Sequence, residues 1–159
     1  MNEKVFQSEL AETFRKEGAW AKKWPDQPVS FMRDNGAGKL RFAVPKPYDI
    51  QLCLPDGRFG CIECKMVKGP SFLVDDHVQE QLKTLLDIVK RNGYAALAVN
   101  FRFARKTSGR TNRAFIVDQP CWLDGMMLQP HRHSMTEFLI TGRELQRIAG
   151  GWSGAVSVA

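Results

Sequence analysis

Apolar residues recur at helical spacing in two separate stretches of the chain. The first stretch, residues 2–17, ends before Gly18, and the second runs to about Asn92 behind a capping Asp75 or Asp76. Their apolar positions are Val5, Phe6, Leu10 and Phe14 in the first and Val78, Leu82, Leu85, Leu86 and Val89 in the second. Because residues three and four apart lie on one face of a helix, both stretches predict amphipathic helices.

Other segments are rich in aliphatic and aromatic residues without helical spacing, which is typical of strands. Pro55-Asp56-Gly57 supplies a fixed φ and then a residue tolerant of positive φ, so residues 48–67 predict a hairpin. A further strand after the second helix makes a right-handed parallel crossover. The predicted strands are Ala19–Trp24, Tyr48–Leu54, Arg58–Val67, Tyr94–Phe103 and Arg113–Val117. The pattern therefore predicts an α/β fold with a central mixed β-sheet flanked by α-helices.

Two regions follow neither pattern cleanly. Residues 27–46 combine Pro and Gly with basic residues, and predict either a projecting basic loop or a β-ribbon that turns at Asn35-Gly36. Met135–Ile148 follows Ser134, which with Glu137 forms a capping box, so a terminal helix is predicted there. A chain of 159 residues without internal repeats is expected to be a single domain, residues 1–159.

Charged residues stand in the hairpin at positions where a strand usually carries apolar ones. Side chains alternate between faces, so Glu63 and Lys65 share one face, and Asp49 and Gln51 join them if the register allows. Two carboxylates beside a lysine are the groups that metal-assisted phosphodiester hydrolysis needs. The alternative is a surface hairpin with an ordinary Glu–Lys neighbourhood.

Pro47-Tyr48-Asp49, followed after the hairpin turn by Glu63-Cys64-Lys65, resembles the signature of the PD-(D/E)XK nuclease superfamily. The order of elements is similar to that of the Holliday junction resolvases, both the archaeal and the RecU-like kinds, including phage-encoded relatives. The resemblance covers roughly Phe6 to Phe103, and Tyr48 departs from the usual spacing in a way that RecU-like members share. It implies a restriction-endonuclease-like core.

The resemblance also implies a metal site with one or two Mg²⁺ or Mn²⁺ ions and no small-molecule cofactor. Asp49 and Glu63 would hold the metal together with the backbone carbonyl of Cys64. A glutamate of the first helix would complete the site, and Glu9 matches that position, with Glu12 as the alternative. In this scheme Asp49, Glu63 and Glu9 are catalytic as well as metal-binding residues.

Further catalytic roles follow from the same resemblance. Lys65 would position the attacking water, and Gln81, which comes nine residues after Phe72, matches a helix glutamine of the RecU-like proteins. The products would be a 5′-phosphate and a 3′-hydroxyl. Because a four-way junction needs two symmetric cuts, a homodimer is expected. Candidates for its surface are the first helix and Trp122, Leu123, Met126 and Met127.

The charge balance favours a polyanionic partner. The formal net charge is +6 and the pI is about 9.3, within an ordinary globular composition of 43% hydrophobic and 25% charged residues. Basic residues are expected to contact DNA in the 27–46 segment, after the lysine strand, and in a predicted basic loop that includes Arg113. The expected contacts are Arg33, Lys39, Arg41, Lys46, Lys68, Arg102, Arg105, Lys106 and Arg110.

The cysteines and the termini exclude other classes. Cys61 and Cys64 form a CxxC, but in a strand they point to opposite faces and no second ligand pair completes a zinc site. His131 and His133 lack a third ligand and stay unassigned. Reduced cysteines, no signal peptide and no membrane span predict a cytoplasmic protein.

Other functions remain open on the sequence alone. The chain could be another PD-(D/E)XK nuclease, such as a restriction enzyme, a VRR-type repair nuclease or an exonuclease. It could also be the nuclease subunit of a larger assembly, or an inert nucleic-acid binder that keeps the fold.

Overall fold

The computed structural model describes residues 3–25, 32–34, 37–39, 46–105, 109–117, 122, 124–129 and 135–138. Its helices are α1 (Glu3–Lys16) and α2 (Asp76–Val89). Its strands are β1 (Trp20–Lys23), β2 (Met32–Asp34), β3 (Ala37–Lys39), β4 (Ile50–Cys53), β5 (Phe59–Val67), β6 (Phe72–Leu73), β7 (Tyr94–Arg105), β8 (Gly109–Val117), β9 (Met127–Leu128) and β10 (Met135–Phe138).

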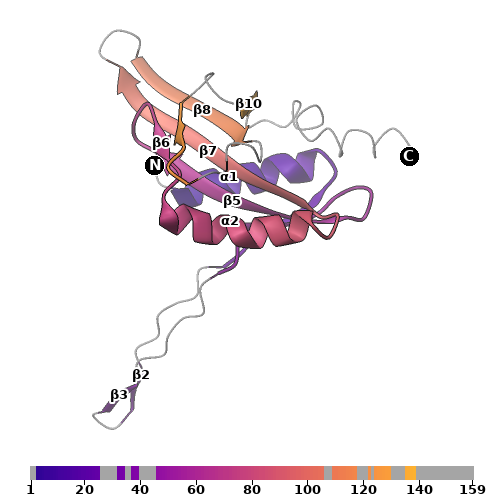
Figure 1. The fold of residues 1–159 in the computed structure, drawn as a ribbon. Helices are drawn as coiled ribbons and strands as arrows, with labels where there is room; N and C mark the ends of the chain where they lie inside the picture. The colour runs from indigo at the N-terminus through magenta and orange to yellow at the C-terminus, as the bar shows by residue number, and fades with distance from the viewer. Residues whose placement is uncertain are drawn as a thin grey trace.

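A six-stranded mixed sheet forms the centre of the domain, in the order β1-β4-β5-β7-β8-β10. The β4–β5 hairpin is antiparallel with Ile50 opposite Ile62, whereas β5 and β7 run parallel because α2 connects them (Figure 1). The predicted α/β fold with a central mixed sheet and flanking helices is confirmed. The described helices include none long and apolar enough to cross a membrane.

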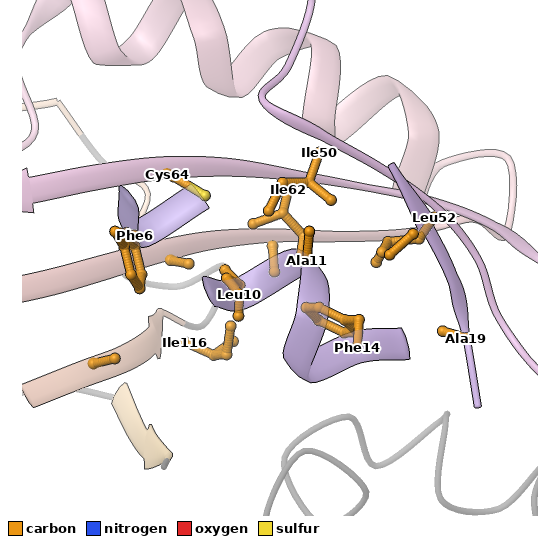
Figure 2. Packing of buried hydrophobic residues seen from close by; sticks show 14 of the residues in the cluster. Phe6, Leu10, Ala11, Phe14, Ala19, Ile50, Leu52, Ile62, Cys64 and Ile116 are labelled. Atoms are coloured by element: carbon orange, nitrogen blue, oxygen red, sulfur yellow. The ribbon is translucent and has the colours of Figure 1, made fainter. Parts of the chain in front are cut away.

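The helices bury the two faces of this sheet separately. Along β5, Ile62 and Cys64 belong to the cluster that α1 covers, while Cys61 belongs to the cluster under α2. Figure 2 shows the α1 layer, in which Phe6 and Phe14 belong to the same buried cluster as Leu52 and Cys64 of the sheet. The period of two along the strand therefore matches a sheet with a helix on each side.

The α2 layer depends on a well-capped helix. Asp75 is the N-cap, and its Oδ1 accepts a 3.0 Å hydrogen bond from the backbone N–H of Val78. Val78, Leu82 and Leu85 are then buried against the sheet. Asp75, one of the two predicted caps, is thus the residue used.

Within residues 27–46, β2 and β3 form a separate two-stranded antiparallel sheet with Met32 opposite Lys39. Figure 1 draws this small hairpin well away from the central sheet. The rest of the predicted loop or β-ribbon, residues 27–31, 35, 36 and 40–45, lies outside the described residues.

The C-terminal part departs from the prediction. The expected helix from Met135 is wrong at its start, since Met135–Phe138 forms β10 and pairs antiparallel with β8, with Met135 opposite Val117. The exposed edge of β8 offers unpaired backbone groups, and pairing with them outweighs the local capping box. Residues 139–148 lie outside the described part of the chain.

The predicted basic loop around residues 102–113 is also corrected. The strands β7 and β8 continue as a long hairpin in which Arg105 pairs with Gly109, so Arg102, Arg110 and Arg113 lie on strands. A short β6–β9 pair, with Phe72 opposite Leu128, was not predicted.

Candidate active site

Asp49 lies in the short segment that leads into β4. Its backbone N–H donates to Ile62 (3.0 Å) and its carbonyl accepts from the Trp24 N–H (2.7 Å), which fixes it level with Glu63 on β5. The side chain is only 2% exposed, and its Oδ2 accepts a 2.8 Å hydrogen bond from the backbone N–H of Cys64. The carboxylate therefore lies against the backbone of β5 beside Glu63.

Glu63 is buried in the middle of β5, with 3% of its surface exposed. The Nζ of Lys65 donates a 2.9 Å hydrogen bond to its Oε1, and the lysine side chain is 16% exposed. Two positions apart on a strand, these side chains lie on the same face, as predicted. The structure thus brings Asp49, Glu63 and Lys65 together.

Burial and neighbouring charges shift the pKa values of the acids and thiols around this site. Burial, followed by the negative charge of Asp49, raises the pKa of Glu63 to about 7, whereas Lys65 lowers it in part. Burial and then the charge of Glu63 raise the pKa of the Cys61 thiol to about 12. The pKa of Cys64 is also raised, mainly by burial. Cys61 and Cys64 belong to the clusters on opposite faces of the sheet, so they are not placed to bind one zinc ion together.

Lys46 also belongs to this site, although the sequence pattern predicted it only as a DNA contact. Its Nζ lies 2.6 Å from Oδ1 of Asp49, and its side chain is 29% exposed. The available signal was a basic residue three positions before Asp49, which a bend in the chain brings onto the carboxylate. Each buried carboxylate therefore has its own lysine.

Glu9 takes a different position from the one expected. Its Oε2 accepts a 2.7 Å hydrogen bond from Nη2 of Arg102, and that arginine also contacts Asn100. Glu12, the alternative, pairs with Arg15 on the surface. Among the described residues there is no group of three His, Cys, Asp or Glu that could hold a metal ion. The structure does not bring Glu9 to the Asp49–Glu63 pair.

Two other polar residues of α1 are held against the sheet or buried. Oε2 of Glu3 accepts a 3.2 Å hydrogen bond from the backbone N–H of Met66, and its charge contributes to the raised pKa of Cys64. Gln7, one turn later, is 2% exposed, and its Oε1 is buried without a hydrogen-bond partner. The sequence analysis missed both, although their spacing of four residues puts them on one helix face.

Gln81 lies on α2, and its Oε1 is buried without a hydrogen-bond partner. An unsatisfied buried amide oxygen is costly, and such an atom is suited to accept from a water or to bind a cation. The neighbouring Gln79 is used structurally, since its Nε2 donates to the carbonyl of Trp122 (2.9 Å).

The predicted DNA contacts are spread over several elements. Arg33 and Lys39 lie on the β2–β3 hairpin, Arg105 and Arg110 on the β7–β8 hairpin, and Lys68 is exposed directly after β5. Lys46 and Arg102 are engaged with Asp49 and Glu9 as described above. Arg41, Lys106, His131, His133 and Leu123 lie outside the described residues.

The apolar residues proposed for a dimer surface are only partly exposed. Trp122 is buried (4% exposed) and its Nε1 donates to the carbonyl of Val117 (2.9 Å), so its assignment to a surface is wrong. Indole rings pack into cores when their N–H finds a partner. Met127 is 45% exposed.

The carboxylate pair fits a hard divalent cation. Mg²⁺ is usually held by one or two carboxylates together with waters and substrate phosphate oxygens. Asp49 and Glu63 supply two such groups. The residues present are therefore compatible with Mg²⁺ or Mn²⁺ and not with a thiolate metal site.

Comparison with known proteins finds a likeness among solved structures only. No family model and no curated protein matches the chain. Among solved structures, Hjc from Archaeoglobus fulgidus, a Holliday junction resolvase from an archaeal hyperthermophile, matches with 19% sequence identity, a TM-score of 0.45, and coverage of 80% of this chain and 88% of that chain.

Proposed function

We propose that this chain is a metal-dependent DNA endonuclease that resolves four-way junctions. The observation that carries the proposal is the pair of buried carboxylates, Asp49 and Glu63, each in contact with a lysine. The junction as substrate rests on the sequence resemblance and on the distribution of basic residues.

The carboxylate pair is expensive for a purely structural role. Burying an ionised carboxylate costs several kcal/mol unless it is fully compensated, and two adjacent carboxylates repel each other. The raised pKa of Glu63 reflects this cost. Perturbed acids of this kind, held rigidly on a sheet, are typical of functional sites.

Lys65 and Lys46 are placed for different roles in the reaction. Lys65 is held on Glu63 with its ammonium partly exposed, so it can donate to the attacking water or to a phosphate oxygen. Lys46 neutralises Asp49 and is the more exposed of the two, so it can move to the substrate phosphate when a cation takes its place. A divalent cation held by Asp49 and Glu63 would supply Lewis-acid stabilisation of the charge that develops on the phosphate.

Several features support branched DNA as the substrate. The net charge of +6 attracts a polyanion, and Arg33 and Lys39 lie on a hairpin that stands apart from the central sheet. A ribbon of this kind can enter the open centre of a junction. Two symmetric cuts would be made by a homodimer, each leaving a 5′-phosphate and a 3′-hydroxyl.

A cleavage assay tests the proposal. The purified protein is incubated with a four-way junction, a linear duplex and a single strand of matched sequence, each with EDTA or Mg²⁺. Paired nicks in the junction that need Mg²⁺ are expected. The matched variants are Glu63→Gln, which is expected to be inactive, and Glu80→Gln. The second variant removes a carboxylate from the exposed ion pair with Lys83 on α2 and should cut normally.

The outcomes separate the alternatives. Equal cutting of duplex or single strands would keep the nuclease site and reject the junction preference. Mg²⁺-dependent cutting that survives Glu63→Gln would reject the site. Binding of DNA without any cutting would favour an inert binder or the subunit of a larger assembly.

A further inference from the structure

One face of the β1–β4–β5 edge carries exposed aromatic residues in register with the carboxylate site. Strand pairing places Trp20 opposite Cys53 and Cys53 opposite Phe59, so their side chains share a face. The partners of the alternate positions, Ala21 and Leu52, are buried under α1. The row that contains Trp20 therefore lies on the face opposite α1.

This row is open to solvent. Trp20 is 53% exposed and Phe59 is 40% exposed, values that are high for large apolar side chains. Two exposed aromatic residues on one face of the sheet, on either side of Cys53, form a patch typical of an interaction site.

The next row along the strands is polar. Lys22 lies opposite Gln51, which lies opposite Cys61. The chain then reaches Trp24, whose backbone N–H bonds to the carbonyl of Asp49. Successive rows are about 6.6 Å apart, since a strand rises about 3.3 Å per residue. The aromatic row and the carboxylate pair are thus separated by about 13 Å.

A hollow of about 270 Å³ adjoins the Lys22–Gln51 row at the β1 edge of the sheet. It is lined by Lys22, Lys23, Trp24, Pro25 and Gln51. The indole of Trp24 is held by an edge-on contact with Tyr48, with the ring centroids 5.4 Å apart. Its volume is slightly below that of pockets for drug-sized ligands, so it suits a group of about the size of one base.

The chemistry of this surface matches an unpaired nucleotide. Aromatic rings on a sheet stack with bases of any sequence, and neighbouring lysines bind the phosphates. The amide of Gln51 can bond to a base edge. Paired bases in a duplex do not expose their faces, so such a surface selects bases that are out of the stack.

We propose that the face formed by Trp20, Lys22, Trp24, Gln51 and Phe59 binds one or two unpaired nucleotides that adjoin the phosphate to be cut. This inference rests on the proposed nuclease function and specifies its substrate as DNA with unpaired bases beside the cleavage point. A protein partner is disfavoured, because lysines are depleted in the cores of protein–protein interfaces.

The test measures DNA binding without cleavage. Anisotropy of a labelled twelve-nucleotide oligo-dT and of a labelled duplex of equal length is recorded in EDTA at fixed salt. The variants are Trp20→Ala and Lys22→Ala, both at exposed positions. The matched control is Lys83→Ala, which removes an exposed lysine from α2. Thermal unfolding and size-exclusion chromatography check the fold and the oligomeric state.

Trp20→Ala is expected to weaken oligo-dT binding about tenfold while duplex binding changes little. Lys22→Ala should weaken oligo-dT binding several-fold, and Lys83→Ala should leave it unchanged. The proposal is overturned if the wild-type protein does not bind oligo-dT, or if Trp20→Ala weakens both DNAs equally or neither. It is also overturned if Trp20→Ala changes the oligomeric state, which would make this face a subunit interface.

The binding readout separates this inference from the proposed function. Selective loss of oligo-dT binding in a protein that cuts no DNA would retain the binding surface and reject the nuclease. Normal junction cutting combined with unchanged oligo-dT binding in Trp20→Ala would retain the nuclease and reject the binding surface.

Discussion

Replacing Glu63 by Gln should make the protein more stable at alkaline pH while it abolishes cleavage. Burial and the charge of Asp49 raise the pKa of Glu63 from 4.5 to about 7. The folded state therefore binds a proton that the unfolded state has already released between these pH values. The contribution of Glu63 to stability is fully present below pH 4.5 and is lost as the pH rises through about 7.

The magnitude follows from the same shift. Each pH unit between the two pKa values is worth about 1.4 kcal/mol, so the wild-type protein loses about 3 kcal/mol of unfolding free energy from this group. Glutamine has a similar shape, carries no charge, and can still accept the hydrogen bond from Lys65. The variant should match the wild type at low pH and exceed it by about 3 kcal/mol at pH 8, or roughly 6–12 °C in Tm.

Urea unfolding in EDTA at several pH values between 4.5 and 8.5 measures this difference. Glu80→Gln is the matched control, because its carboxylate pairs with a lysine on the exposed face of α2, and its stability should track the wild type at every pH. A Glu63→Gln protein that is no more stable than the wild type at pH 8 would refute the claim that Glu63 is a buried, destabilised carboxylate.

Added Mg²⁺ extends the same experiment. A cation that binds only the folded protein stabilises it by an amount that grows with the logarithm of its concentration. At pH 8 we expect Mg²⁺ to raise the stability of the wild type and to leave Glu63→Gln unchanged. Equal stabilisation of both proteins would place the metal elsewhere.

Asp49→Asn should remove cleavage and keep DNA binding, measured by gel shift in EDTA; unchanged turnover would remove Asp49 from the site. Lys65→Ala should lower the single-turnover cleavage rate on the order of 100-fold with little change in DNA affinity, and a loss of affinity alone would assign it to binding. Gly93→Ala should destabilise the fold by about 1–3 kcal/mol, since a Cβ there would lie 2.5 Å from Cγ2 of Ile88; a thermal unfolding curve equal to that of the wild type would contradict this.

The helices and the central hairpin could be predicted because their patterns are local. The stripe Phe6, Leu10 and Phe14 has helical spacing, and all three side chains are fully buried. The alternation along β5 was equally readable, so Glu63 and Lys65 were placed on one face from the sequence. The helix prediction from Met135 was wrong because pairing with the distant edge of β8 makes these residues a strand. Such long-range contacts leave little signal in the local sequence.

Only the part of the site that follows from alternation along a strand could be predicted. Lys46 and Glu3 were missed because their contacts depend on a bend before β4 and on the position of α1 over β5. Glu9 was placed by resemblance, and the structure instead pairs it with Arg102, which is 93 residues away in the chain.

The sequence by itself determined the periodicities, the hairpin turn and the residue types of the Asp49, Glu63 and Lys65 group, because these depend on neighbours within a few positions. Only the tertiary structure decided which charges meet and which face stays open. Register between β1, β4 and β5 places Trp20 and Phe59 on one face, on either side of Cys53, and burial raises the pKa of Glu63. Such effects arise from desolvation and from contacts between distant segments, which a linear pattern does not encode.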